Sequence, residues 1–332
     1  MKFITYRPTA AKPGQSRAGL LLGRYVVDLE QISKVWREEK GQLDQPPLPN
    51  SLLAYLELED EGRRIMTEIA IWLKSFDEKG LCDDPRFVCF PSEETELLSP
   101  LPQPRSFRDF YAFEEHVKTA RGRRGLEMVP QWYEFPVFYF SNHNAFLGPD
   151  AELERPAYTQ WLDYELEVAC VIGKTGRNVK PEEAHEYIAG FTVLNDWSAR
   201  DVQREEVKVG LGPAKGKDFA TSMGPYLLTL DELEDVRDGD RWKLEMTASV
   251  NGRELSRGNF GAIYFSFGEL IARASDGVTL RPGEVIGSGT VGTGCILELG
   301  TEVHRWLEPG DVVELSIERL GVLRNKVVES RE

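Results

Sequence analysis

The second half of the chain is a series of short segments in which apolar and polar residues alternate, with turn signals between them. Residues 161–176 follow the two-residue period of a strand that buries one face, and residues 312–328 continue as short strands. Asn251-Gly252 lies between two further segments of this kind, and such a pair predicts a β-hairpin. Helical periodicity is scarce there. The sequence therefore predicts an α+β fold, mostly β, with a rolled or barrel-like mixed sheet rather than a doubly wound α/β sheet.

The chain of 332 residues is long enough for one large domain or two ordinary ones. Three prolines within residues 100–104 resist both helix and central strand, so the boundary is predicted there. A small β-rich N-terminal domain would then cover residues 1–99, and a catalytic domain residues 105–332. Within the first domain, short strands are expected up to about residue 30 and helix over residues 51–75.

Charge and composition narrow the class of partner. Hydrophobic residues make up 41% and charged residues 29%, which is typical of a globular protein, and the net charge is −15. A field of that sign repels phosphate backbones and anionic membranes, so neither nucleic acid nor a membrane is expected as partner. No apolar run spans a bilayer and residues 1–15 lack the core of a signal peptide, so a cytoplasmic location is predicted. An anionic substrate would need local positive charge, such as a bound cation or an arginine cluster.

The four cysteines are Cys82, Cys89, Cys170 and Cys295. They form neither a CxxC pair nor a zinc spacing with histidine. Reduced, buried and inert thiols are predicted, and nothing indicates an oxidising compartment.

Acidic side chains at the ends of strand-like segments indicate a metal site. Glu165 and Glu167 point to the same face of a strand, and two adjacent carboxylates repel each other unless a proton or a hard divalent cation lies between them. A solvent-facing strand is the alternative. Asp196 follows an apolar strand directly, where a turn or helix cap is the alternative. Asp109 and His116 lie in FRDFYAFEEH, although a lone histidine is often only a surface helix residue.

The combination of motifs is more specific than any one of them. RDFY followed by a histidine, then LDYELE, NDWSARDVQ, and GSGT with ILEL occur in this order. They resemble the fumarylacetoacetate hydrolase family over roughly residues 100–320, and NDWSARD is the most specific of them. The resemblance implies a mixed β-roll catalytic domain, an enzyme of aromatic catabolism and a homodimer. Residues 1–98 resemble the family's smaller N-terminal domain only in size and strand content.

The same resemblance implies roles for individual side chains. Asp109, Glu165, Glu167 and Asp196 would hold Mg²⁺ or Ca²⁺, with Mn²⁺ as an alternative; His116 would be the general base that activates water; Glu298 would orient it; Lys217 would lie near the metal and the leaving group; and Tyr111, Tyr139, Arg200, Gln203 and Thr290 would contact substrate.

The sequence also departs from the family pattern. The loop before Lys217 is one residue longer, so Lys215 is an alternative to it. No arginine follows His116 at the expected spacing. Arg123 and Arg124 could replace it on a mobile lid, or they could belong to a solvated charge run. Thr119 stands where other branches of the superfamily have a glutamate, which favours the hydrolase arrangement.

The expected reaction is metal-dependent hydrolysis of a carbon–carbon bond in a small anionic dioxo acid, fumarylacetoacetate-like or acylpyruvate-like, through a metal-bound enolate. Isomerisation, hydration or decarboxylation of a 2-oxo acid is the first alternative, because these reactions pass through the same enolate. A non-catalytic metal-binding domain is an alternative of another class, and pairing of His116 with Glu298 would argue against it.

A glycine pattern at residues 287–292 matches the dinucleotide-binding fingerprint formally. The residues that follow, 294–299, show a strand pattern and not the helix that a phosphate site requires. A turn between two strands is therefore predicted.

Overall fold

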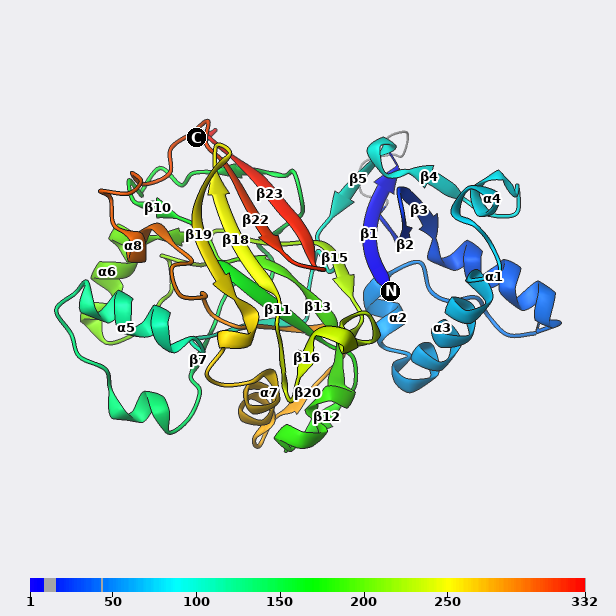
Figure 1. Ribbon diagram of the computed structural model, residues 1–332, viewed down its shortest axis with the longest axis horizontal. Coiled ribbons are helices and arrows are strands. Elements are labelled where there is room, and N and C mark those ends of the chain that lie inside the picture. The colour runs from blue at the N-terminus through cyan, green and yellow to red at the C-terminus, as the bar shows by residue number, and fades with distance from the viewer. Residues whose placement is uncertain (9–15, 43, 332) are drawn as a thin grey trace.

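The computed structural model describes residues 1–8, 16–42 and 44–331 (Figure 1). Part of the N-terminal stretch used to exclude a signal peptide, residues 9–15, lies outside them. In the first hundred residues the strands are β1 (Lys2–Pro8), β2 (Arg17–Leu22), β3 (Tyr25–Asp28), β4 (Cys89–Pro91) and β5 (Thr95–Leu98). The helices there are α1 (Leu29–Lys40), α2 (Leu52–Leu56), α3 (Glu59–Leu73) and α4 (Glu78–Asp83).

The predicted N-terminal strands and the helix over residues 51–75 are confirmed, the latter as α2 and α3. Helix α1 adds to them. It begins after Asp28, whose side chain accepts the Gln31 N–H, and it ends at Gly41 in the left-handed conformation that favours glycine. This part of the chain is therefore richer in helix than expected.

The rest of the chain is dominated by short strands. They are β6 (Ser106–Phe110), β7 (Phe138–Phe140), β8 (Phe146–Leu147), β9 (Glu152–Glu154), β10 (Leu162–Asp163), β11 (Leu166–Ile172), β12 (Gly176–Arg177), β13 (Ile188–Asn195), β14 (Ser198–Ala199), β15 (Thr221–Leu228), β16 (Arg237–Asp238), β17 (Arg241–Trp242), β18 (Glu245–Val250), β19 (Arg253–Asn259), β20 (Thr279–Leu280), β21 (Glu284–Gly287), β22 (Val312–Ile317) and β23 (Gly321–Val328). The helices are α5 (Glu114–Gly122), α6 (Arg200–Val209), α7 (Phe267–Ser275) and α8 (Ile296–Leu299).

One mixed sheet runs through the described part of the chain in the order β4-β3-β2-β1-β15-β13-β11-β21-β6-β7. Its pairs are mostly antiparallel, and β21–β6 is one of the parallel exceptions. A second sheet has the order β19-β18-β22-β23-β9, and its first hairpin turns at Asn251-Gly252 as predicted. These large mixed sheets with flanking helices confirm the expected α+β fold class and exclude a doubly wound sheet.

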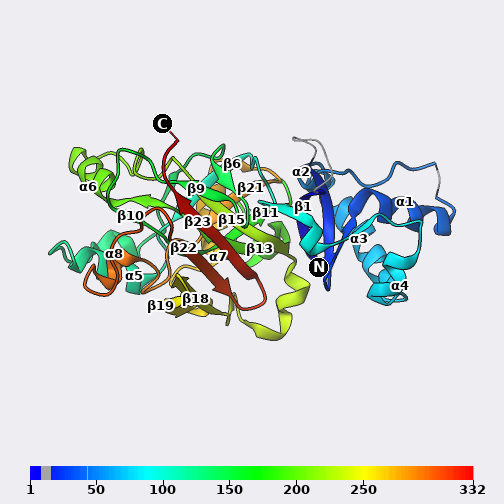
Figure 2. The same ribbon diagram turned by 90° about the horizontal axis from the view of Figure 1, so that it is seen from above.

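The predicted division into two domains at residues 99–105 stays a prediction. The large sheet continues across it, because Phe3 of β1 pairs with Leu227 of β15. Strand β11 is buried on both faces: Val168 and Cys170 belong to the core shared with the second sheet, whereas Val171 packs in the core of the N-terminal helices. Helices α5, α6 and α8 gather at the end of the molecule opposite the N-terminal helices (Figures 1 and 2).

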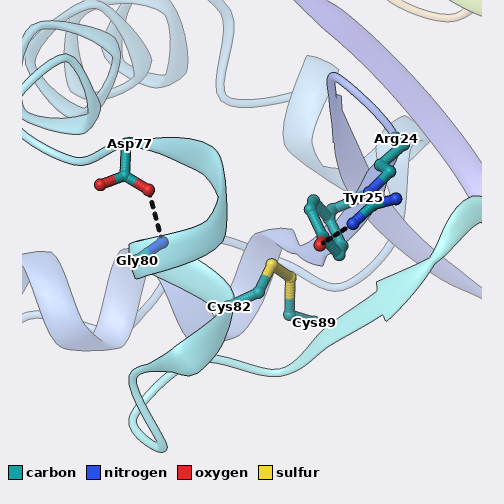
Figure 3. The surroundings of a disulfide bond; sticks show 6 residues. All are labelled: Arg24, Tyr25, Asp77, Gly80, Cys82 and Cys89. Atoms are coloured by element: carbon teal, nitrogen blue, oxygen red, sulfur yellow. Dashed lines mark hydrogen bonds between the residues drawn. A yellow bond between two sulfur atoms is a disulfide. The ribbon is translucent and has the colours of Figure 1, made fainter.

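Two local predictions are wrong. Residues Ile296–Leu299, expected as strand, form the short helix α8, whose first N–H groups are accepted by Asp163, far away in sequence. Cys82 and Cys89, expected as reduced thiols, form a disulfide between α4 and β4 (Figure 3). Their Cα atoms lie 5.4 Å apart, a separation that suits such a bond and depends on the path of the chain between them. Cys170 and Cys295 are free and buried as predicted.

Among the described residues, no helix has both the length and the apolar composition that crossing a bilayer would require. The cytoplasmic location itself stays a prediction.

Candidate active site

Four buried carboxylates from neighbouring strands form the centre of the candidate site. Asp109 is on β6, Glu165 and Glu167 lie just before and within β11, and Asp196 directly follows β13. Oxygen atoms of the first three lie within 4.8 Å of one another. Gly287 of β21 stands opposite Asp109 in the sheet, and a Cβ atom there would collide with the Asp109 carboxyl group. The first glycine of the formal dinucleotide pattern therefore makes room for a carboxylate, and no nucleotide site is implied.

Lys217 is the lysine that the structure places at this cluster. Its side chain is buried and forms ion pairs with Glu165 and, at 2.7 Å from Nζ to Oδ2, with Asp196. Lys215 is exposed and pairs instead with Asp218 at 3.0 Å. Although burial lowers the pKa of Lys217, the carboxylates of Asp196 and Glu165 raise it above its usual value, so the side chain stays charged.

The carboxylates have unused acceptor capacity. Asp109 Oδ1 and Glu167 Oε2 are buried and have no hydrogen-bond partner among the described residues. Burial and the nearby Asp196 raise the pKa of Asp109 to about 8, and burial and Asp109 raise the pKa of Glu167 well above its usual value. Both shifts indicate too little positive charge at these oxygens. An all-oxygen set of this kind fits a hard divalent cation.

The pKa of Glu165 is shifted in the opposite direction. Burial raises its pKa, but the Lys217 ammonium and the Arg200 guanidinium together bring it well below the usual range. Arg200 donates to Glu165 Oε1 at 2.8 Å and to Gln203 Oε1 at 3.0 Å. Arg200 is the first residue of α6, so this helix places Arg200 at Glu165 and Gln203 against Arg200.

His116 and Glu298 form a second buried group, on α5 and α8. Nδ1 of His116 lies 2.5 Å from Oε1 of Glu298, and both residues are 4% exposed. Glu298 Oε2 accepts the backbone N–H of Thr293 at 3.0 Å. A carboxylate only accepts, so it favours the tautomer with the proton on Nδ1 and leaves Nε2 free to take a proton.

Besides Arg200, three aromatic or hydroxyl side chains predicted to bind substrate touch these groups. The Tyr111 ring packs edge-on against the His116 ring, with centroids 5.3 Å apart. The Tyr139 hydroxyl donates to the Asp196 carboxylate, and the Thr290 hydroxyl lies 3.3 Å from Glu167 Oε1. The structure thus brings Tyr139 and Thr290 to the carboxylate cluster and Tyr111 to His116, and the contact of all three with substrate stays a prediction.

The two predicted lid arginines have protein partners. Arg123 donates to the backbone carbonyls of Glu298 and Leu299 at 3.1 and 2.7 Å, and to the Glu302 carboxylate at 3.0 Å. Arg124 donates to the carbonyl of Ala120 at 3.1 Å. Arg123 therefore faces α8, and a role of either arginine in substrate binding stays a prediction.

Two further polar residues, for which the sequence predicts no role, lie at the site. Thr221 lies with its hydroxyl 3.3 Å from Asp196 Oδ1. Asp163 is fully buried and accepts from Arg200 Nε at 2.8 Å. Asp163 belongs to the LDYELE motif, next to the two glutamates, and that position was the available signal.

Comparisons with known proteins identify the family of this chain. Residues 105–328 match the family described as Fumarylacetoacetate (FAA) hydrolase C-terminal, so the chain belongs to the fumarylacetoacetate hydrolase family. Oxaloacetate tautomerase YisK of Bacillus subtilis is 28% identical over 305 residues, which cover 91% of this chain and 94% of that protein. The human mitochondrial oxaloacetate tautomerase FAHD2A is 37% identical over 199 residues, 58% of this chain and 59% of that protein.

A solved structure shares the whole architecture. Fumarylacetoacetate hydrolase from psychrophilic Exiguobacterium antarcticum superposes with a TM-score of 0.70 at 26% identity, covering 99% of this chain and all of that one. The superfamily thus includes both hydrolases and tautomerases, and this chain is similar to members of both groups.

Proposed function

We propose that the protein is a hydrolase that cleaves a carbon–carbon bond between two carbonyl groups of a small anionic dioxo acid. The observation that carries the proposal is the buried contact between His116 and Glu298, at 2.5 Å, beside a set of carboxylates suited to a divalent cation. A histidine whose Nδ1–H is held by a carboxylate is arranged to take a proton from water through Nε2.

Each side chain of the site has a separate role in the proposed reaction. His116 removes a proton from water as the oxygen adds to the acyl carbonyl, and Glu298 stabilises the resulting imidazolium. The bond from that carbon to the neighbouring CH₂ then breaks, which yields a carboxylic acid and, after proton return to carbon, a methyl ketone. Lys217 and Arg200 offset negative charge beside Glu165. Mg²⁺, Ca²⁺ or Mn²⁺ on Asp109, Glu165, Glu167 and Asp196 would supply Lewis-acid stabilisation of the leaving enolate.

Tautomerisation of a 2-oxo diacid is a second candidate. A tautomerase matched over 91% of this chain favours it. That reaction moves one proton between carbon and oxygen and needs no water attack, so the same imidazole could carry the proton.

A substrate panel separates the two. Purified protein with magnesium is given acylpyruvates of increasing acyl length, fumarylacetoacetate, and oxaloacetate added as its enol, and products are followed by NMR and enol absorbance. Formation of an acid and a methyl ketone, absent with His116→Ala, supports hydrolysis. Accelerated enol–keto conversion of oxaloacetate, with every dioxo acid left intact, would replace hydrolysis by tautomerisation.

We also propose that the protein is a homodimer, as the family resemblance implies. Light scattering of the purified chain tests this, and a monomeric mass at assay concentration would exclude it.

A further inference from the structure

The buried carboxylate of Asp163 contacts both Arg200, which pairs with the carboxylate cluster, and α8, which carries Glu298. We propose that Asp163 is a positioning residue, which fixes Glu298 against His116 and Arg200 against the carboxylate cluster. The proposal rests on the proposed function, because it assumes that Glu298 acts on His116.

Four donors converge on Asp163, at the end of β10. Its Oδ1 accepts the backbone N–H groups of Ile296 at 2.8 Å and of Tyr164 at 2.9 Å. Its Oδ2 accepts the Leu297 N–H at 3.0 Å and Arg200 Nε at 2.8 Å. A carboxylate can accept all four, and in this place each oxygen serves two donors.

Helix α8 depends on such contacts for its orientation. Its four residues, Ile296–Leu299, are too few for a helix that is stable by itself. Asp163 holds the first N–H groups of this helix, and Arg123 donates to the carbonyls of Glu298 and Leu299 at its other end. A rotation of α8 would therefore move the Glu298 carboxylate away from its position 2.5 Å from the imidazole.

Arg200 connects Asp163 to the carboxylate cluster. Its Nε is held by Asp163 and its second terminal nitrogen by Glu165, both at 2.8 Å. Without the Asp163 charge, the buried guanidinium has Glu165 as its remaining carboxylate partner. Asp163 therefore positions both Arg200, which pairs with the carboxylate cluster, and the helix that carries Glu298, which orients His116.

Asn at position 163 has nearly the same shape but one oxygen and an NH₂ group. The NH₂ group must then face two of the four donors, which lose their acceptor. In Asp163→Asn we expect kcat to fall by about 10- to 100-fold, the range typical when a supporting partner is removed, with a smaller rise in KM.

Asp311→Asn is a matched control. Asp311 is also buried, and it accepts from Arg305 at 2.6 Å, from the Glu308 backbone N–H at 2.8 Å and from the Asn251 side chain at 2.8 Å. None of these partners belongs to the site. The control should lose thermal stability with unchanged kcat and KM.

Two measurements distinguish positioning from a merely structural role. The kcat losses of Asp163→Asn and Glu298→Gln should be non-additive in the double variant, because both act on one unit. NMR of ¹⁵N-histidine protein gives a reading without substrate: the chain has four histidines, and His116→Ala assigns the relevant signals. The Nδ1–H resonance of His116 should shift or vanish in Asp163→Asn and stay in Asp311→Asn.

If Asp163→Asn does not fold, Arg123→Ala provides a second test of how α8 is anchored. Arg123 is half exposed, and its loss frees the other end of α8, so the same His116 resonance should shift. An unchanged His116 resonance in the folded variants, or additive kcat losses, would overturn the proposal. A shifted resonance in a protein that hydrolyses no dioxo acid would instead refute the proposed reaction and leave the positioning role standing.

Discussion

Replacing Glu298 by glutamine tests whether the His116 pair is a functional unit. In the wild-type chain one Glu298 oxygen faces His116 Nδ1 at 2.5 Å and the other accepts the Thr293 N–H at 3.0 Å. Glutamine has one oxygen, so its NH₂ group must face one of these two donors. If it faces the imidazole, the proton moves to Nε2, which can then no longer accept a proton from water.

The size of the effect follows from these contacts. A hydrogen bond to a charged group contributes about 1.5–3 kcal/mol, and about 1.36 kcal/mol corresponds to a tenfold change in rate. Loss of the bond alone therefore predicts a fall in kcat of about 10- to 150-fold. Loss of the correct tautomer extends the fall to about 10²–10⁴-fold, the range typical of a missing general base, and the same range is expected for His116→Ala.

The assay compares kcat of Glu298→Gln, His116→Ala and the double variant on the best substrate of the panel, with metal affinity measured by calorimetry. Metal affinity should stay unchanged because neither residue belongs to the carboxylate set. The double variant should be no worse than His116→Ala. His185→Ala, at an exposed histidine, serves as control. An inactive His116→Ala beside a fully active Glu298→Gln would refute the pairing, and full activity in both would exclude hydrolysis by this site.

The remaining predictions concern charge. Chelation should abolish activity, magnesium, calcium or manganese should restore it, and a fully active metal-free protein would contradict the cation site. Lys217→Met should lower kcat strongly, whereas Lys215→Met should leave it unchanged in the same steady-state assay. Arg124→Ala should chiefly raise KM for anionic substrates, because this arginine lies near Tyr111. Burial raises the pKa of Asp311, but hydrogen bonds from Arg305 and a backbone N–H bring it to about 2, below the unfolded value. Asp311 therefore stabilises the fold above about pH 4, by roughly 2 kcal/mol, and this contribution is lost as the pH falls toward 2. Urea unfolding of wild type and Asp311→Asn at pH 7 and pH 3 checks this: the difference in unfolding free energy should shrink at the lower pH.

The sequence predicts local structure correctly where a single strand or a single turn determines that structure. Alternation in LDYELEV predicted a strand with both glutamates directed to one place, and the structure brings Glu165 and Glu167 together. Asn251-Gly252 predicted its hairpin because both residues adopt positive φ angles, which this pair tolerates. The resemblance supplied the long-range pairing of His116 with Glu298, which lie 182 positions apart and which no local pattern could join.

Prediction was wrong where contacts distant in sequence decide local structure. The residues of α8 alternate like a strand, yet tertiary contacts from Asp163 and Arg123 make them a helix. Cys82 and Cys89 meet because α4 and β4 fold back on each other, which their spacing does not reveal. The role of Asp163 is not visible in its motif because its partners, Ile296, Leu297 and Arg200, are distant in sequence.

The charge balance of the site links metal and substrate. The chain carries a net charge of −15, and the metal-binding cluster proposed for the site gathers four buried carboxylates within that field, with Asp163 as a further one beside Arg200. Two buried cations, Lys217 and Arg200, offset part of the negative charge of these carboxylates. The raised pKa values of Asp109 and Glu167 indicate that the negative charge near these two side chains is not fully offset. An anionic substrate would meet repulsion there until a divalent cation supplies the missing charge. Substrate affinity should therefore depend on metal occupancy, and by thermodynamic linkage a bound substrate analogue should tighten metal binding by the same factor.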